Sequence, residues 1–470
     1  ENHLLTPSFL IIQNSALSVI RSQAIPPRRP SLQENIYSYE ARNYNFLKCD
    51  RLSSPEVYGR AMARNLIDRC VNPEAFLKAT ENTIAFSKMS LLQWLNKREP
   101  SQIKSLQSEL SRPLDLDTAI HYFKLMVKRD AKVKLDSTSL VKHSPAQNIM
   151  FHAKHVNALY SPCFDEFKNR LMSCLHSNIV FFTEMDNRQF ARVVSGLISD
   201  YDDEYRIGEI DFSKFDKSQD IFVKEFEREI YSLFSFDAEL LDLWMQGEYR
   251  AKATTLDGQL SFDVVNQRRS GASNTWIGNS LVTLGMLSLY YRVNDFKALF
   301  ISGDDSLIYS ETPITNHADA ICIETGFETK FMTPSVPYLG SKPGVCCGHK
   351  TYVVPDPYKL MVKLGSVRKE VDDSELFEVY TSFKDLTKDF DDERVVRKLS
   401  LPLASKYGFD SVHCLPALHS IHCLNSNFKS FLKLYNRKSG WFTVKKLLPN
   451  LKRLIFQGKL NCAKVSHFFW

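Results

Sequence analysis

Two groups of acidic residues near the middle of the chain have the types and spacing needed to bind divalent cations. Asp211 follows a run with strand character, Tyr205 to Ile210, and Gly303-Asp304-Asp305 separates two short apolar runs. That second pattern predicts a β-hairpin with two adjacent carboxylates at its tip. Mg²⁺ prefers oxygen ligands, and two ions about 3.5 to 4 Å apart can stabilise both the attacking and the leaving oxygen of a phosphoryl displacement. We therefore expect Asp211 and Asp304 to be metal ligands on neighbouring strands, with Asp305 assisting.

A loop of small residues lies between these two acidic groups. It runs from Ser270 to Asn274 and leads into an apolar helix that should extend to about Tyr291. Gly271 permits backbone conformations that other residues resist, so the loop can lie close to a sugar-phosphate chain. Ser270, Thr275 and Asn279 would then present polar groups to whatever the carboxylates hold. The alternative is an ordinary core helix capped by Ser273 or Asn274, and a solvent-exposed turn is likewise the alternative for the Asp304-Asp305 pair.

The elements that must position these residues divide the chain into three parts. The first third is mostly helical, the centre from about 205 to 354 mixes strands and helices, and the end is helical and basic. Composition is that of a globular protein, with 44% hydrophobic and 24% charged residues, which excludes a disordered or collagenous chain. The chain begins at Glu1 rather than Met, so we expect a cut fragment, a processed polyprotein or the downstream part of a longer product.

Net charge hides a strong partition along the chain. The 60 basic and 54 acidic residues give only +6, but no acidic residue follows Asp410, whereas ten basic residues do. A second basic stretch runs from Lys124 to Lys154, and an acidic block spans Glu370 to Glu393. Two basic surfaces that flank acidic sites are expected if a polyanion must be held while metal ions bind elsewhere, although each run is also compatible with a solvated helix face.

Three motifs, in this order, resemble palm motifs A, B and C of RNA-dependent RNA polymerases from positive-strand RNA viruses. They are Asp211-x4-Asp216, Ser270-Gly271-x3-Thr275-x3-Asn279 and Gly303-Asp304-Asp305. Their flanking residues resemble the alphavirus-like supergroup, and most closely the polymerases of plant closteroviruses. The resemblance extends from about Tyr37 to the 430s.

The resemblance implies a role for each matching residue. Asp211, Asp304 and Asp305 would hold two Mg²⁺ ions, for which Mn²⁺ could substitute. Asp216 and Asn279 would read the 2′-hydroxyl of the incoming ribonucleotide, with Ser270, Gly271 and Thr275 nearby. The finger motif that grips the triphosphate is matched by four basic residues, Lys128, Arg129, Lys132 and Lys134. Lys330 matches the motif D lysine that protonates pyrophosphate, and motif E departs from the family pattern at Gly340.

The same resemblance implies an α+β fold, a right hand of fingers, palm and thumb with an antiparallel palm sheet. Residues 1–35 would form an N-terminal extension or linker, 36–204 the fingers, 205–345 the palm with a finger insertion around 220–260, and 346–470 the palm end and the basic helical thumb. Implied partners are template RNA, nascent RNA, ribonucleoside triphosphates and a viral methyltransferase/helicase replicase protein. In the host cytoplasm, such partners would recruit the chain to membrane-associated replication complexes.

Two other functions are compatible with parts of this pattern. A template-independent terminal nucleotidyltransferase would use similar carboxylates, and a non-catalytic RNA-binding replication subunit would use only the basic stretches. A reverse transcriptase is disfavoured by Gly303 and by the Asp216 and Asn279 pair. The His413 to Cys423 cluster has no spacing typical of a zinc site and also fits an amphipathic helix.

Overall fold

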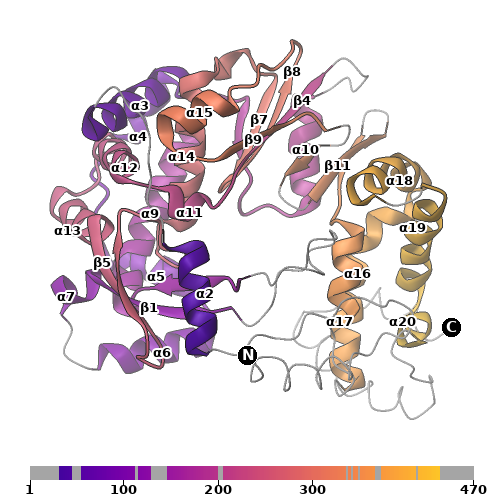
Figure 1. The fold of residues 1–470 in the computed structure, drawn as a ribbon, viewed down its shortest axis with the longest axis horizontal. Helices are drawn as coiled ribbons and strands as arrows, with labels where there is room; N and C mark the ends of the chain where they lie inside the picture. The colour runs from indigo at the N-terminus through magenta and orange to yellow at the C-terminus, as the bar shows by residue number, and fades with distance from the viewer. Residues whose placement is uncertain are drawn as a thin grey trace.

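The computed structural model describes the chain in several stretches, and the functional residues lie mainly in its centre (Figure 1). The described residues are 31–44, 54–111, 115–128, 145–198, 205–334, 337–339, 342–347, 350–365, 372–408 and 411–433. Within these stretches, helices and strands alternate in the mixed α/β manner predicted for the centre. None of the described helices has the length and apolar character that a bilayer crossing requires.

A five-stranded sheet forms the centre of the fold. Its strand order is β3-β7-β8-β4-β9, and every neighbouring pair is antiparallel except β3 and β7. The predicted antiparallel sheet is therefore present, with one parallel strand added at its edge. The five strands are β3 (Ile179–Phe181), β4 (Arg206–Phe212), β7 (Ala298–Ser302), β8 (Asp305–Ser310) and β9 (Thr329–Met332).

Helices cover both faces of this sheet, which explains why β7 is a continuous apolar run. Leu299 and Ile301 belong to the large core that α14 (Thr275–Tyr290) shares with α3 (Pro55–Cys70) and α12 (Ile221–Leu233). Phe300 points to the other face and belongs to a smaller core under α10 (Asn187–Leu197). Twelve residues of α14 are buried, so its apolar sequence reflects contact with neighbours on all sides.

A second sheet, with the order β2-β1-β5-β6, lies beside the first. Within it β1 (Tyr122–Val127) pairs in parallel with β5 (Arg250–Thr255), although more than a hundred residues separate them in sequence. β2 (Asn148–Phe151) and β6 (Ser261–Val265) are its edge strands. The other helices of this part of the chain are α2 (Leu32–Arg42), α4 (Pro73–Ala79), α5 (Lys88–Asn96), α6 (Pro100–Leu110), α7 (Leu116–Ile120), α9 (Lys154–Cys174), α11 (Phe215–Ser218) and α13 (Ala238–Tyr249).

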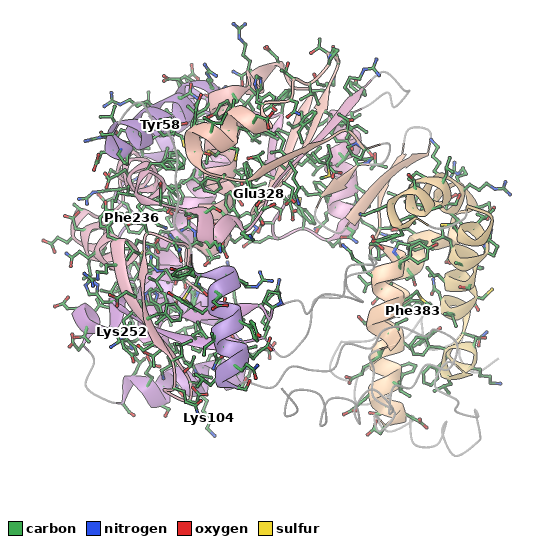
Figure 2. The ribbon with its side chains drawn as sticks, in the orientation of Figure 1. Tyr58, Lys104, Phe236, Lys252, Glu328 and Phe383 are labelled. Carbon is green, nitrogen blue, oxygen red and sulfur yellow. The ribbon has the colours of Figure 1, made fainter. Side chains whose placement is uncertain are left out.

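The C-terminal helices form a unit with its own hydrophobic core, drawn in light orange to yellow in Figure 1. Phe383 and Phe431 are buried there, and Figure 2 shows Phe383 inside this unit. The unit contains α16 (Pro357–Gly365), α17 (Asp373–Thr387), α18 (Glu393–Tyr407), α19 (Ser411–Ser426) and α20 (Phe428–Lys433). It joins the central sheet through β10 (Tyr338–Leu339), β11 (Lys342–Cys347) and β12 (Lys350–Val353), while α15 (Ala318–Thr325) packs beside β9. The predicted helical end is confirmed up to Lys433.

Candidate active site

The register of the strands brings the predicted carboxylates together at one end of the interior strands of the five-stranded sheet. β4 pairs with β8 so that Ile210 lies opposite Ser306. One further step in this antiparallel register places Asp211 opposite Asp305, the first residue of β8. Asp304 lies in the turn that connects β7 to β8. The predicted hairpin is present and pairs with the strand of Asp211, but Asp305 lies in a strand rather than in the turn, and the role of these residues as metal ligands stays a prediction.

The turn that carries Asp304 requires glycine at its first position. Gly303 has φ of +66°, and a two-residue hairpin loop with glycine there fits the right-handed twist of the flanking strands. Two hydroxyl groups from α14 hold this glycine. The Gly303 N–H donates to Ser280 Oγ at 2.9 Å, and Thr283 Oγ1 donates to the Gly303 carbonyl at 2.9 Å. Because Ser280 and Thr283 are fully buried, the helix fixes the backbone next to Asp304.

Lys330 lies directly opposite Asp211 on the neighbouring strand. β9 pairs with β4 on the side away from β8, and Asp211 is the register partner of Lys330. Directly opposed residues in an antiparallel pair have Cβ atoms about 4.5 to 5.5 Å apart and point to the same face. The lysine side chain is exposed. Sequence position alone did not establish that Lys330 and Asp211 are neighbours, and the register does.

The side chains at this end of the sheet have the oxygen atoms that a hard cation prefers as ligands. Asp211, Asp304 and Asp305 offer only carboxylate oxygens, which are the ligands that Mg²⁺ and Mn²⁺ take. In the part of the chain that the structure describes, no three His, Cys, Asp or Glu side chains gather closely enough to hold an ion as they stand. The donor types and their strand positions are compatible with a metal site, and the binding of an ion there stays a prediction.

The loop before α14 is held against β2 by backbone contacts. Gly271 N–H donates to the Met150 carbonyl at 2.8 Å, and Ser270 Oγ donates to the Asn148 carbonyl at 3.1 Å. A Cβ atom on Gly271 would lie 2.7 Å from the Met150 oxygen. Gly271 is not among the glycines with positive φ, so our conformational argument for it was wrong. The close approach of two backbones is what requires glycine here.

Thr275 also bonds to the loop backbone. Its hydroxyl donates to the Arg269 carbonyl at 2.7 Å and lies 2.8 Å from the Ala272 carbonyl. Asn274 occupies the N-cap position of α14, but its side chain makes no capping hydrogen bond. Because the hydroxyl protons of Ser270 and Thr275 bind carbonyls, these residues stabilise the loop. A direct role for them in nucleotide binding stays a prediction.

The predicted pair Asp216 and Asn279 is brought together. Asn279 Nδ2 donates to Asp216 Oδ1 at 2.9 Å, and the asparagine is only 8% exposed. Burial raises the pKa of Asp216, while the hydrogen bond from Asn279 and the charge of Arg268 oppose that shift. Their contact is confirmed by the structure, whereas their action on a ribose stays a prediction.

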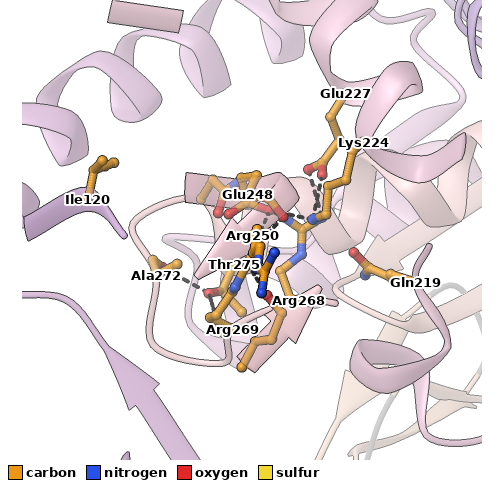
Figure 3. Close-up of polar contacts among 12 residues, drawn as sticks. Ile120, Gln219, Lys224, Glu227, Glu248, Arg250, Arg268, Arg269, Ala272 and Thr275 are labelled. Carbon is orange, nitrogen blue, oxygen red and sulfur yellow. Dashed lines mark hydrogen bonds and ion pairs between the residues drawn. The ribbon is translucent and has the colours of Figure 1, made fainter. Parts of the chain in front are cut away.

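Behind this pair lies a buried cluster of charges that the sequence analysis missed (Figure 3). Its members have no more than 2% of their surface exposed and are Lys224, Glu227, Glu248, Arg268 and Arg269. Arg268 Nη2 donates to Glu227 Oε1 at 2.6 Å, and Arg269 Nη1 lies 3.3 Å from Glu248 Oε2. Charged side chains are almost never fully buried unless they are paired, so the sequence alone places them at the surface. The adjacent pair Arg268-Arg269, directly before the loop, was the available signal.

The sequence of this chain matches a known protein family over most of its length. A family model described as RNA dependent RNA polymerase matches residues 9–434. The chain belongs to the RNA-dependent RNA polymerase family. The resemblance of the three motifs to this family is thereby confirmed over most of the sequence.

The chain is similar to replicase proteins of several plant viruses. It is 61% identical over 425 residues to replicase polyprotein 1ab of Beet yellows virus (isolate Ukraine), a closterovirus. The matched region covers 90% of this chain and 14% of that relative. The chain is 33% identical over 459 residues to replicase polyprotein 1ab of Grapevine leafroll-associated virus 3, covering 97% and 16%. The RNA-directed RNA polymerase of Barley stripe mosaic virus is 28% identical over 447 residues, covering 93% and 55%. The chain thus spans about one seventh of the length of the first two relatives.

Only one residue of the predicted triphosphate-binding motif lies within the described residues. Lys128 is exposed just after β1, and its backbone N–H donates to the Gln147 carbonyl at 2.7 Å. The other three predicted residues, Arg129, Lys132 and Lys134, lie outside the described residues. β1 and β2, which flank this segment, belong to the sheet that contacts the loop at Ser270 and Gly271. The basic residues after Lys433 and the motif E position Gly340 also lie outside the described residues.

Two histidines of the C-terminal helical unit, His419 and His422, lie beside acidic residues. His422 Nδ1 lies 2.7 Å from Asp391 Oδ1, and His419 Nε2 lies 3.6 Å from Glu393 Oε2. Cys414 is buried and receives a hydrogen bond from the Tyr358 hydroxyl at 2.9 Å. The stretch forms α19, as the alternative to a zinc site predicted.

Proposed function

We propose that this chain copies RNA from an RNA template, using ribonucleoside triphosphates, and thereby replicates and transcribes a positive-strand RNA virus genome. The proposal rests mainly on the register of four strands, β7, β8, β4 and β9. This register brings together, at one end of the sheet, Asp211, Asp304, Asp305 and Lys330. Membership of the polymerase family supports the same reaction.

The arrangement of the elements supports a right hand. The five-stranded sheet with α10 and α14 would be the palm, because it carries the carboxylates. The sheet β2-β1-β5-β6 and the helices around it would be the fingers, and the unit from α16 to α20 would be the thumb. In Figure 1 these last two groups lie on opposite sides of the view, below and beside the central sheet.

In the proposed reaction, the 3′-hydroxyl oxygen of the growing RNA attacks the α-phosphate of the nucleotide. A new bond forms between that oxygen and the α-phosphorus, the hydroxyl proton passes to water, and the bond from the α-phosphorus to the oxygen that bridges to the β-phosphate breaks, which releases pyrophosphate. Asp211, Asp304 and Asp305 would hold Mg²⁺, or Mn²⁺ in its place. When bound there, the ions supply positive charge that stabilises the attacking and leaving oxygens. Lys330 would give a proton to the departing pyrophosphate.

Selection of ribonucleotides would depend on Asp216 and Asn279. A site built to hydrogen-bond a hydroxyl rejects the analogue that lacks it, because its buried polar groups are then left unpaired. Lys128, Arg129, Lys132 and Lys134 would contact the triphosphate, since charge-assisted hydrogen bonds to phosphate oxygens are strong. Ser270, Gly271 and Thr275 would keep the loop in place beside the nucleotide.

The partners in this proposal follow from the relatives. One relative, from Raspberry bushy dwarf virus, is named methyltransferase/helicase/RNA-directed RNA polymerase, and this chain covers 25% of it. A viral methyltransferase/helicase replicase protein is therefore the proposed partner, in addition to template and nascent RNA. That partner would bring the chain to membranes in the host cytoplasm.

A template-directed incorporation assay tests the proposal. The wild-type chain, a defined RNA template with a primer, Mg²⁺ and one nucleotide at a time should give extension only with the nucleotide complementary to the next template base. Equal extension with all four nucleotides would identify a terminal nucleotidyltransferase. Binding of RNA without any incorporation, in either Mg²⁺ or Mn²⁺, would identify a non-catalytic subunit, and a preference for deoxynucleotides would identify a reverse transcriptase.

A further inference from the structure

The buried charge cluster behind the Asp216 and Asn279 pair has an excess of positive charge. Three cations, Lys224, Arg268 and Arg269, face two carboxylates, Glu227 and Glu248. The positive charges lower the pKa of Glu248 against the effect of its burial. Burying ionised groups is costly unless each one is paired. Asp216 lies near this cluster, because the positive charges of Arg268 and Lys224 oppose the rise that burial causes in its pKa.

Arg268 contacts both members of the candidate sugar-reading pair. Its backbone N–H donates to the Asp216 carbonyl at 3.0 Å. Its side-chain Nε donates to Asn279 Oδ1 at 3.0 Å. The other side of its guanidinium donates to Glu227 at 2.6 Å, which fixes the plane of the group. Arg268 is only 1% exposed, so it lies behind the pair and has no open path to a nucleotide.

The amide of Asn279 is locked by two donors. Gln219 Nε2 donates to the same Asn279 Oδ1 at 3.0 Å, so this oxygen receives hydrogen bonds from both Gln219 and Arg268. The Asn279 NH₂ group must then face Asp216, where the structure places it. Flipping the amide would direct NH₂ at the guanidinium of Arg268 and the oxygen at the carboxylate of Asp216, and both of these contacts are repulsive.

We propose that Arg268, together with Gln219, is a positioning residue for sugar selection: it fixes the amide of Asn279 so that the Asp216 and Asn279 pair meets the nucleotide in one orientation. This inference rests on the proposed function of that pair. Loss of either donor frees the amide, and the pair then no longer distinguishes a ribose from a deoxyribose as sharply.

The test measures kcat and KM for a ribonucleotide and for its 2′-deoxy analogue in primer extension by the full chain. In the Arg268→Lys and Gln219→Met variants, the ratio of the two kcat/KM values should fall at least about tenfold, as expected when a buried hydrogen bond is lost. The change should arise mainly from a higher KM for the ribonucleotide. A 3′-deoxy ribonucleotide, which keeps the 2′-hydroxyl, should follow the ribonucleotide.

Matched controls separate positioning from folding. Arg228→Lys on α12 and Gln246→Met on α13 make the same exchanges at exposed sites outside the cluster and should leave the ratio unchanged. If Arg268→Lys does not fold, Gln219→Met decides, because Gln219 contacts Asn279 without belonging to the charge cluster. An unchanged ratio in Gln219→Met, or equal losses for both nucleotides, would overturn the inference. Failure of the proposed function is distinct, because the wild-type chain would then show no preference for the ribonucleotide.

Discussion

The hydroxyl groups that hold Gly303 offer a sharp test of how the fold positions Asp304. Ser280 Oγ accepts from the Gly303 N–H and donates to the Trp276 carbonyl, each at 2.9 Å. In the Ser280→Ala variant the Gly303 N–H is left buried without a partner, which costs about 1–3 kcal/mol. The turn can recover that energy only by moving away from α14, and Asp304 moves with it.

A displacement of about 1 Å at a reacting centre lowers the rate by about a hundredfold. We therefore expect Ser280→Ala to lower kcat for nucleotide incorporation by about tenfold to a hundredfold. The free energy of unfolding should fall by about 1–3 kcal/mol, and the affinity for RNA should not change. Steady-state primer extension, urea denaturation and RNA titration measure the three quantities separately.

Ser288→Ala is the matched control. Ser288 is also fully buried on α14, and its hydroxyl donates to the Gly285 carbonyl at 2.7 Å and accepts from Asn65 at 3.1 Å. It lies eight residues beyond Ser280, about 12 Å further along the helix. Its removal should cost similar stability and leave kcat unchanged. An equal loss of kcat in both variants, or none in Ser280→Ala, would refute the reasoning.

Three further predictions follow from other parts of the structure. Gly271→Ala should lower extension more than tenfold because its Cβ would meet the Met150 oxygen at 2.7 Å, whereas Gly196→Ala, with nothing within 4 Å, should match wild type in the same assay. Burial lowers the pKa of His152 from 6.5 to about 4, so the unfolded chain binds the extra proton and stability should fall as the pH drops from 6.5 to 4. The His152→Phe variant should lack about 2 kcal/mol of that decline at pH 5 in urea denaturation, and identical pH profiles would contradict this. Truncation after Lys433 removes eight of the ten basic residues beyond Asp410 and should weaken RNA binding and reduce its salt dependence, and unchanged affinity at low salt would contradict the basic-tail assignment.

The truncation is placed after Lys433 rather than at Asp410. Charge alone pointed to Asp410, after which no acidic residue occurs. The structure shows that Leu418, Ile421 and Phe431, all beyond Asp410, belong to the core of the C-terminal unit. A cut at Asp410 would therefore disrupt folding as well as RNA contacts, and only the cut after α20 tests the charge.

Local pattern was enough to predict the hairpin and the long apolar helix. The run, turn and run around Gly303 specify two paired strands, and the apolar stretch after Thr275 is too long for a strand. Pairings between distant segments were not predictable in this way. β3 has only three residues, and the parallel partner of β1, β5, lies more than a hundred residues away, so neither pairing has a local signal in the sequence.

The parts of the candidate site that sequence missed are buried polar groups. Ser280 and Thr283 look like chance polar residues in an apolar helix, although both face the Gly303 turn. Arg268 and Lys224 look like surface charges, although both are buried. A charged residue inside a protein is recognisable only when its partners are known, and those partners come from different elements.

The most direct test of the account is the effect of Asp304→Ala on template-directed RNA synthesis. The wild-type chain should extend a primer on a defined RNA template when Mg²⁺ is added. Asp304→Ala should bind the same RNA with similar affinity and incorporate no nucleotide. Retained extension by Asp304→Ala would contradict the claim that this end of the sheet is the catalytic centre.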